Sequence, residues 1–202
     1  MREEDLSPKV KALYDAVLHL IKADMDVKEI KVSDITDRAG IGKGTAYEYF
    51  DNKEEIISSA LLYYIDRICR HIMERLSETE DFSDMLYVIL DYLDEEIENN
   101  RCFIKFVHLV TDSGPISRMI HKGIREKDGE ICMPEKVVDM MITKGIKNGS
   151  IKNEFPYSYM SIAVMAKILV YAFYITDEAS RGEYSKAEMK KLICGGLVKE
   201  LN

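Results

Sequence analysis

The chain has 202 residues, a net charge of −8 at pH 7 and 47% hydrophobic residues. This length allows one large or two small domains with a sizeable core, and the apolar content excludes a disordered chain. The acidic balance excludes a protein that binds nucleic acid through bulk positive charge, since residues 1–56 alone hold 9 Lys and Arg against 13 Asp and Glu. Any contact with DNA must therefore depend on a few locally placed groups.

The first predicted element is a helix that begins after Ser7 and Pro8, an N-cap residue followed by proline at the first helical position. Apolar residues then recur at the i, i+3, i+4, i+7 spacing of one buried helix face. These residues are Val10, Leu13, Tyr14, Val17, Leu18 and Ile21.

Two shorter helices are predicted next. Val32, Ile35 and Ala39 mark the second helix, and Gly40, which tolerates a positive φ, is suited to end it. A third helix is expected over about residues 42–50. Two short helices separated by a tight glycine turn, behind a longer first helix, predict a helix-turn-helix.

The rest of the chain shows helical periodicity and no strand signal. A long helix is predicted from Lys53 to about Ser77, and the acidic side chains between residues 91 and 98 are expected on a solvated face. The sequence thus predicts an all-α protein, with a helix-turn-helix domain over residues 1–53 and a larger helical domain over residues 54–202. Further helices are expected at residues 81–99, 101–112, 115–127, 134–148, 156–178 and 185–201.

The cysteines indicate neither a disulfide framework nor a zinc site, because none is paired in a C-x-x-C spacing. The amino terminus, M-R-E-E-D-L-S-P-K, also lacks the apolar segment of a secretory signal. We therefore expect reduced thiols, a cytoplasmic location, no metal and no cofactor. The four cysteines are Cys69, Cys102, Cys132 and Cys194.

The run R-A-G-I-G-K-G-T-A-Y-E-Y-F at residues 38–50 contains residue types that bind phosphate. It is not a Walker A loop, because Asp37 stands at the first glycine and Gly44 at the hydroxyl that would bind Mg²⁺. It is not a dinucleotide fingerprint either, because Thr45 replaces the third glycine and a helix, not a strand, precedes it. The remaining candidate is the phosphate backbone of DNA.

A helical wheel at 100° per residue places Ala46 and Phe50 inward, one turn apart. The opposite face is centred on Gly44 and Glu48, with Thr45 and Tyr47 beside it. Gly44 would let the backbone approach a groove closely because it has no Cβ. The neighbouring hydroxyl groups suit phosphate oxygens.

Residues 32–56 resemble the helix-turn-helix of the TetR/AcrR transcriptional regulators. The family motif is roughly apolar-x-[DE]-I-A-x-x-A-G-V-S-x-G-T-L-Y-x-Y-F-x-x-K-E-x-L. This chain reads V-S-D-I-T-D-R-A-G-I-G-K-G-T-A-Y-E-Y-F-D-N-K-E-E-I. The resemblance covers about 25 contiguous residues, and the family's all-helical C-terminal domain agrees with the remaining chain in architecture only.

Departures from the motif are expected to affect packing and contacts. Gly42 replaces the serine that usually caps the recognition helix, and Thr36 replaces a small core alanine. Ala46 replaces a larger apolar residue. Lys31 replaces a threonine and is expected to reach a phosphate through its charge.

The resemblance implies that phosphates contact Thr45, Tyr47 and Lys53. Lys43 and Gly44 would lie against the major groove, and Tyr49 near the backbone. Glu48 either accepts a hydrogen bond from cytosine N4 or is solvent-exposed or paired with a cation. The predicted DNA-binding residues are Lys31, Lys43, Gly44, Thr45, Tyr47, Glu48, Tyr49 and Lys53.

A helix-turn-helix monomer contacts too little DNA for specificity, so a homodimer on a palindromic operator is expected. Residues 159–175 are apolar almost all round and contain Lys167. A membrane span is the competing reading of this stretch, which is short for a bilayer. We expect instead that the helices near residues 156–178 and 185–201 of two subunits form a four-helix interface.

The family's C-terminal domain usually binds a small-molecule effector. Eleven methionines, six phenylalanines and twelve tyrosines suit an adaptable, largely apolar pocket, and an apolar or amphipathic effector is expected. For each candidate taken singly, an ordinary core role is the favoured interpretation, and the pocket is expected of the domain as a whole. The candidates are Tyr64, Tyr92, Phe103, Phe106, His108, Met119, Met140 and Met141.

These observations together predict a ligand-responsive, DNA-binding transcriptional regulator, expected to be a repressor released by its effector. No catalytic residues are expected, because no nucleophile–base couple has support in the sequence. Two other classes stay open. One is a helical-bundle enzyme, and the other is a helical interaction protein without DNA binding.

Overall fold

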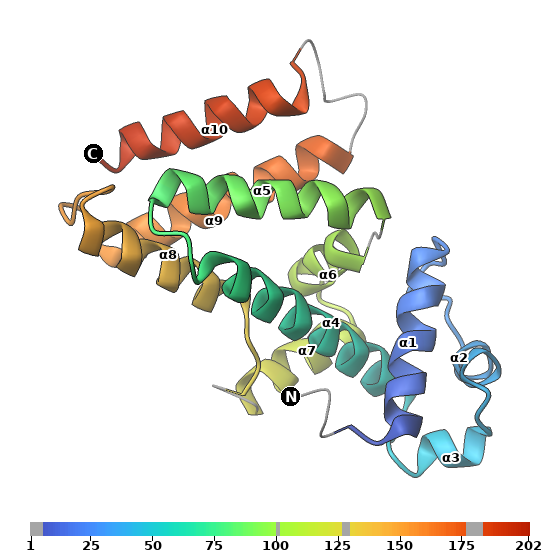
Figure 1. The fold of residues 1–202 in the computed structure, drawn as a ribbon. Coiled ribbons are helices and arrows are strands. Elements are labelled where there is room, and N and C mark those ends of the chain that lie inside the picture. Colours follow the sequence, from blue (N-terminus) through green and yellow to red (C-terminus); the bar gives the residue numbers. More distant parts are fainter. Residues whose placement is uncertain (1–5, 100–101, 127–129, 177–183) are drawn as a thin grey trace. The chain divides into compact units, whose positions relative to one another are not determined.

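The computed structural model describes residues 6–99, 102–126, 130–176 and 184–202. These residues form α-helices and no strand (Figure 1), which confirms the predicted all-α class. The helices are α1 (Pro8–Lys22), α2 (Val32–Ala39), α3 (Lys43–Tyr47), α4 (Lys53–Leu76), α5 (Phe82–Asn99), α6 (Cys102–Thr111), α7 (Pro115–Glu126), α8 (Pro134–Asn148), α9 (Tyr157–Thr176) and α10 (Lys186–Glu200).

The local signals for α1 and α2 act as expected. The hydroxyl of Ser7 accepts a hydrogen bond from the backbone N–H of Val10, and Pro8 is the first helical residue. Gly40 has a φ of 66°, the left-handed conformation that ends α2, and the N–H of Ile41 then reaches back to the carbonyl of Thr36. The expected helix over residues 42–50 is shorter and ends at Tyr47.

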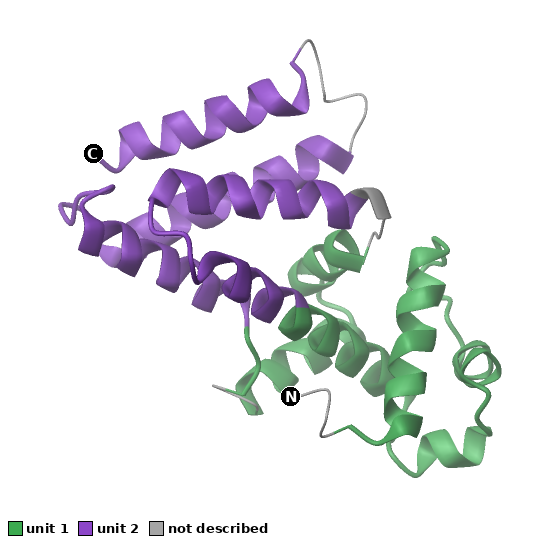
Figure 2. Ribbon diagram, viewed as in Figure 1, with its two compact units in different colours: residues 1–67, 100–132 green, residues 68–99, 133–202 purple. Residues whose placement is uncertain are grey.

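The chain divides into two compact units (Figure 2), residues 1–67 with 100–132 and residues 68–99 with 133–202. Helix α4 contributes to both, because the division falls after Arg67. The helix-turn-helix shares unit 1 with α6 and α7. The division into a DNA-binding and an effector-binding domain is a functional one and stays a proposal.

In unit 1, α1 packs against α2 and α6, and α2 packs against α3. The predicted stripe of α1 is buried, apart from Leu18, which is half-buried. Residues of the turn between α1 and α2 and of α2 itself are buried as well, among them Ile30 and Ile35. This core fixes the helix-turn-helix on α1.

In unit 2, α5 packs against α8, α9 and α10 through its predicted apolar side. The acidic residues of α5 are not all solvated, which corrects the expectation for Asp91 and Asp94. Asp91 and Asp94 contact the ammonium of Lys190 on α10, and the hydroxyl of Tyr171 on α9 donates to Asp94 over 2.9 Å. Charged groups therefore join three helices where their apolar sides meet.

Helix α9 is long and apolar enough by composition to cross a membrane. It packs against α5, α8 and α10 within unit 2, and Val164, Tyr171 and Ala172 are fully buried there. The core helix of a soluble protein meets the same test of length and composition. Packing therefore accounts for the apolar residues on one side of α9, whereas Ile162, Val170 and Phe173 are exposed.

Candidate nucleic-acid interface

Helix α3 presents one buried and one exposed side, as the helical wheel predicts. Ala46 is fully buried, and the ring of Phe50 lies 6.0 Å from the ring of Tyr14 on α1. Tyr47 is 53% exposed and Glu48 is exposed beside it. Inward packing thus fixes α3, and its outer side is open to a partner.

On the exposed side of α3, a partner could approach the backbone closely at Gly44. A Cβ added to Gly44 would meet no atom within 4 Å, so this surface is open. Lys43 is exposed next to it, and Thr45 is half-buried with Tyr47 and Tyr49 exposed around it. A cation, hydroxyl groups and accessible backbone are what a DNA groove and its phosphates contact. As the departure from the motif suggests, Gly42 caps α3 without a side-chain hydrogen bond.

Lys53, a predicted phosphate ligand, also makes hydrogen bonds within the protein. Its ammonium donates to the carbonyl oxygens of Lys28 over 2.9 Å and Ile30 over 3.0 Å. It thereby ties the first residue of α4 to the segment before α2. One of the three ammonium N–H groups is left for a phosphate.

Two departures from the motif are accommodated locally. Thr36 is 1% exposed, and its hydroxyl donates to the carbonyl of Ser33, so the added polar group is satisfied within the helix. Lys31 is exposed at the N-cap of α2, and its backbone N–H donates to the carboxylate of Asp34 over 2.9 Å. The lysine side chain is thus exposed next to the start of the helix-turn-helix.

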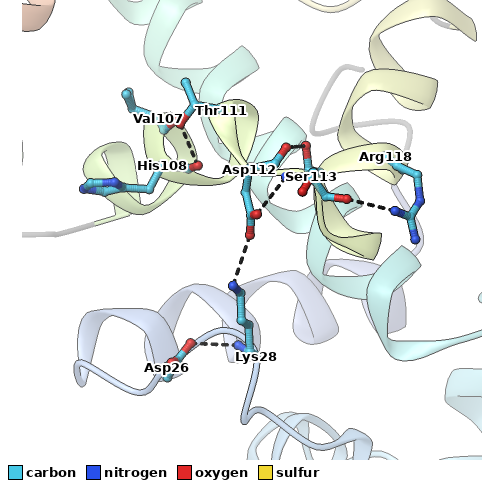
Figure 3. A network of polar contacts seen from close by, with 9 residues as sticks. Asp26, Lys28, Val107, His108, Thr111, Asp112, Ser113 and Arg118 are labelled. Carbon is cyan, nitrogen blue, oxygen red and sulfur yellow. Dashed lines mark hydrogen bonds and ion pairs between the residues drawn. The ribbon is translucent and has the colours of Figure 1, made fainter.

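A second connection joins the segment before α2 to the end of α6 (Figure 3). The ammonium of Lys28 lies 3.1 Å from a carboxylate oxygen of Asp112. The hydrogen bond and charge of Lys28 hold the pKa of Asp112 below its ordinary value. A surface hollow of about 380 Å³ lies beside this pair, lined by Asp26, Val27, Lys28, Lys105, His108, Leu109 and Asp112.

Sequence reasoning did not find this connection, nor the contact of Arg38 on α2 with the imidazole of His19 on α1. Lys28 and Asp112 are 84 positions apart, and no local pattern pairs two charges at such a separation. Arg38 is the first residue of the run 38–50 and lies next to the turn at Gly40. This position is the sequence feature that could have indicated a structural role for Arg38.

The pocket candidates divide between the two units. Tyr64, Phe103 and Phe106 are buried in unit 1, and His108 lines the surface hollow there. No cavity within one unit can be lined by all eight. Met119, which is half-buried, also belongs to unit 1, whereas unit 2 contains Tyr92 and Met141, both buried, and Met140, which is half-buried.

The titratable side chains do not form a metal centre in the described part of the chain, where no group of three or more His, Cys, Asp or Glu residues could hold an ion. The four cysteines are buried. Burial raises the pKa of the Cys194 thiol to about 12, so this thiol is unreactive at neutral pH.

Residues 26–60 match the family model of bacterial regulatory proteins of the tetR family. This range covers the turn before α2, the helix-turn-helix and the start of α4, including Lys28 and Lys53. This part of the chain is therefore similar to the DNA-binding segment of TetR-family regulators. The match supports a DNA-binding transcriptional regulator whose helix-turn-helix contains α2 and α3.

This regulator is similar to proteins of fatty acid metabolism. It is 26% identical over 148 residues to the fatty acid metabolism regulator protein of Bacillus subtilis (strain 168), covering 72% of each chain. Its fold matches FadR from Bacillus subtilis in complex with stearoyl-CoA, with a TM-score of 0.69, 18% identity and coverage of 95% of this chain and 99% of that one. FadR from Bacillus halodurans matches with a TM-score of 0.72 and 18% identity over 98% of both chains.

Proposed function

We propose that this regulator is a repressor that binds a palindromic operator as a homodimer and is released by a small-molecule effector. The observation that carries the proposal is the outer side of α3. There Lys43, Gly44 and Tyr47 are exposed, while Ala46 is buried and the ring of Phe50 packs near Tyr14 of α1. A rigid helix with one open side suits a major groove.

Exposed apolar residues on two helices of unit 2 support the proposal of a dimer. On α9, exposed apolar residues follow one another at helical spacing, with Ile162 68% exposed, Val170 62% exposed and Phe173 41% exposed. On α10, Leu192 is 55% exposed, and Gly195 and Gly196 beside it are open. Apolar side chains left exposed on two adjacent helices fit burial against the same helices of a second subunit.

The effector we propose is a long-chain acyl thioester of coenzyme A. One similar protein is named as a regulator of fatty acid metabolism, and the structure of another contains stearoyl-CoA. The Met- and Phe-rich composition of this chain suits an acyl tail. The pocket candidates of unit 1 are the residues we propose for contacts with the effector, namely Tyr64, Phe103, Phe106, His108 and Met119.

Release requires that the effector bind more tightly to a conformation that fits the operator poorly. Helix α4 belongs to both units, and its first residue, Lys53, is bonded to the segment before α2. A change in α4 would therefore reach the recognition surface directly. By linkage, operator DNA must weaken effector binding by the same factor.

The test is fluorescence anisotropy of the full chain on labelled DNA from upstream of its own gene. Operator affinity is expected in the nanomolar range and should fall steeply as salt rises, since phosphate contacts release counterions. Stearoyl-CoA should release the DNA, whereas coenzyme A and stearate should do so weakly. Absence of binding at low salt would instead favour a helical interaction protein, and turnover of the thioester would favour an enzyme.

A further inference from the structure

Helix α7 has two distinct sides. Ile116, Ser117 and Ile120 are buried. A Cβ added to Gly123 would lie 2.5 Å from a methyl carbon of Leu62, so this glycine allows α7 to approach α4 closely. The opposite side of α7 faces solvent within unit 1.

That outer side is basic. Arg118, His121, Lys122 and Arg125 are all exposed, and Glu126 is the acidic residue among them. These positions follow the i, i+3, i+4, i+7 spacing of one helix face, so neighbouring side chains are close. The rise of 1.5 Å per residue gives the stripe from Arg118 to Arg125 a length of about 10 Å.

The local contacts of the stripe orient its side chains and neutralise little of its charge. The guanidinium of Arg118 donates to the carbonyl of Ser113 over 2.8 Å (Figure 3), and the Nε2–H of His121 donates to a backbone carbonyl over 3.1 Å. Lys122 lies 3.8 Å from Glu126, with both side chains largely exposed. Such an exposed pair exchanges readily with another anion.

We infer that the α7 stripe, defined as Arg118, Lys122 and Arg125, binds the phosphate groups of the effector's coenzyme A headgroup. This inference rests on the proposed effector class. The headgroup carries a pyrophosphate and a separate ribose phosphate, so it places anions at several points along an extended chain. Three cations spaced over about 10 Å match such a polyanion, whereas a single fatty acid carboxylate would need only one.

The charge of the whole chain strengthens the argument. With a net charge of −8, the protein as a whole repels a ligand that carries several negative charges. Binding then requires a local cationic surface, and the stripe offers one in the same unit as the recognition helix. Arginine is suited to this task because its planar fork contacts phosphate bidentately.

The experiment compares the full-length protein with Arg118→Ala/Arg125→Ala, using calorimetric titration with stearoyl-CoA and with stearate. The variant is expected to bind stearoyl-CoA roughly five- to tenfold more weakly than the parent. Its affinity for stearate should equal that of the parent. The salt dependence of stearoyl-CoA binding should become shallower. The matched control is Lys147→Ala/Lys152→Ala, which removes two exposed lysines from unit 2 and should leave both affinities unchanged.

Each other outcome is decisive. If both variants weaken stearoyl-CoA binding equally, or if neither weakens it, the assignment of the stripe is overturned. The proposal of an acyl-CoA effector is unaffected by that result. A loss of operator affinity without any loss of stearoyl-CoA affinity overturns it in favour of a DNA contact. If the parent protein binds no acyl-CoA, the proposed effector class fails, and the inference fails with it. Circular dichroism melting of the variant confirms that it is folded.

Discussion

Lys53 combines two roles that sequence reasoning would assign to different residues. Its position in the motif implies a phosphate contact, whereas its ammonium holds the backbone carbonyls of Lys28 and Ile30. Because one N–H remains, the same group can brace the segment before α2 and still face DNA. At this scale, binding and local stability are expected to depend on the same side chain.

Lys53→Met should therefore weaken both properties. The methionine keeps most of the stem but loses the ammonium, so two carbonyl groups lose a charged donor. We expect the free energy of unfolding to fall by about 1–2 kcal/mol, at the lower end for charged hydrogen bonds because the site is partly exposed. Urea denaturation and operator anisotropy measure the two effects.

Lys43→Met is the matched control, because Lys43 is exposed on α3. It should reduce operator affinity and leave the unfolding free energy unchanged. An unfolding curve for Lys53→Met that superimposes on the parent's would contradict the structural role of Lys53.

An experiment can also decide whether Glu48 reads a base of the operator. It is exposed directly after α3, where a carboxylate either accepts a hydrogen bond from cytosine N4 or faces solvent. If it reads a base, Glu48→Ala should relax the preference at one operator position by about 1–3 kcal/mol. Selection of operators from a random library by both proteins measures this, and identical selected sequences would remove the base-reading role.

At the scale of elements, charged groups connect α5, α9 and α10 within unit 2. Lys190 is 8% exposed, contacts Asp91 and Asp94 and lies 5.8 Å from the ring centre of Tyr171. Burial alone would lower the pKa of Lys190, but hydrogen bonds to the two carboxylates raise it above its ordinary value. The ammonium therefore stays charged and holds α10 on α5.

Lys190→Met should leave the two carboxylates without their main cation and lower the free energy of unfolding by about 1–3 kcal/mol. The value is discounted from that of a fully buried pair because Asp91 is half-exposed. Since the folded-state pKa is raised, this stabilisation is complete below about pH 10.5 and is lost as the pH rises through the raised pKa. Urea denaturation at neutral pH and above pH 10.5 measures both.

The control is the neighbouring exposed lysine, through Lys191→Met. It should leave the unfolding free energy within about 0.5 kcal/mol of the parent's. Equal losses for the two variants would show that general charge, and not the contact with Asp91 and Asp94, accounts for the effect.

At the scale of the whole molecule, operator binding is proposed to depend on a second subunit. The exposed apolar residues of α9 stand on the side away from the core of unit 2, where Val164 and Ala172 are buried. A helix-turn-helix monomer contacts one half-site, so loss of the dimer should reduce affinity far more than loss of one contact.

Val170→Asp should therefore give a folded monomer. An exposed aspartate costs little in the free subunit but would be a buried, unpaired charge in the dimer. Analytical ultracentrifugation should show the monomer mass with unchanged helix content, and operator affinity should fall at least about 100-fold. Lys147→Asp, an exposed change on α8, should stay dimeric, and a dimeric Val170→Asp protein would place the interface elsewhere.

The sequence alone determined the helical class, the position of nearly every helix and the orientation of α3. These features depend on residues close together in the chain, such as the cap at Ser7, the turn at Gly40 and the spacing of Ala46 and Phe50. The family motif is local for the same reason, because one short supersecondary unit contains it.

Only the tertiary structure decided which distant charges meet. The Lys28–Asp112 pair, the bonds of Lys53 to the segment before α2 and the cluster around Lys190 join segments 23 to 99 residues apart. Such contacts follow from how helices pack, and a charged residue on a helix carries no local sign of its partner. The sequence therefore predicted the recognition surface, whereas the contacts that hold and surround it follow from the fold.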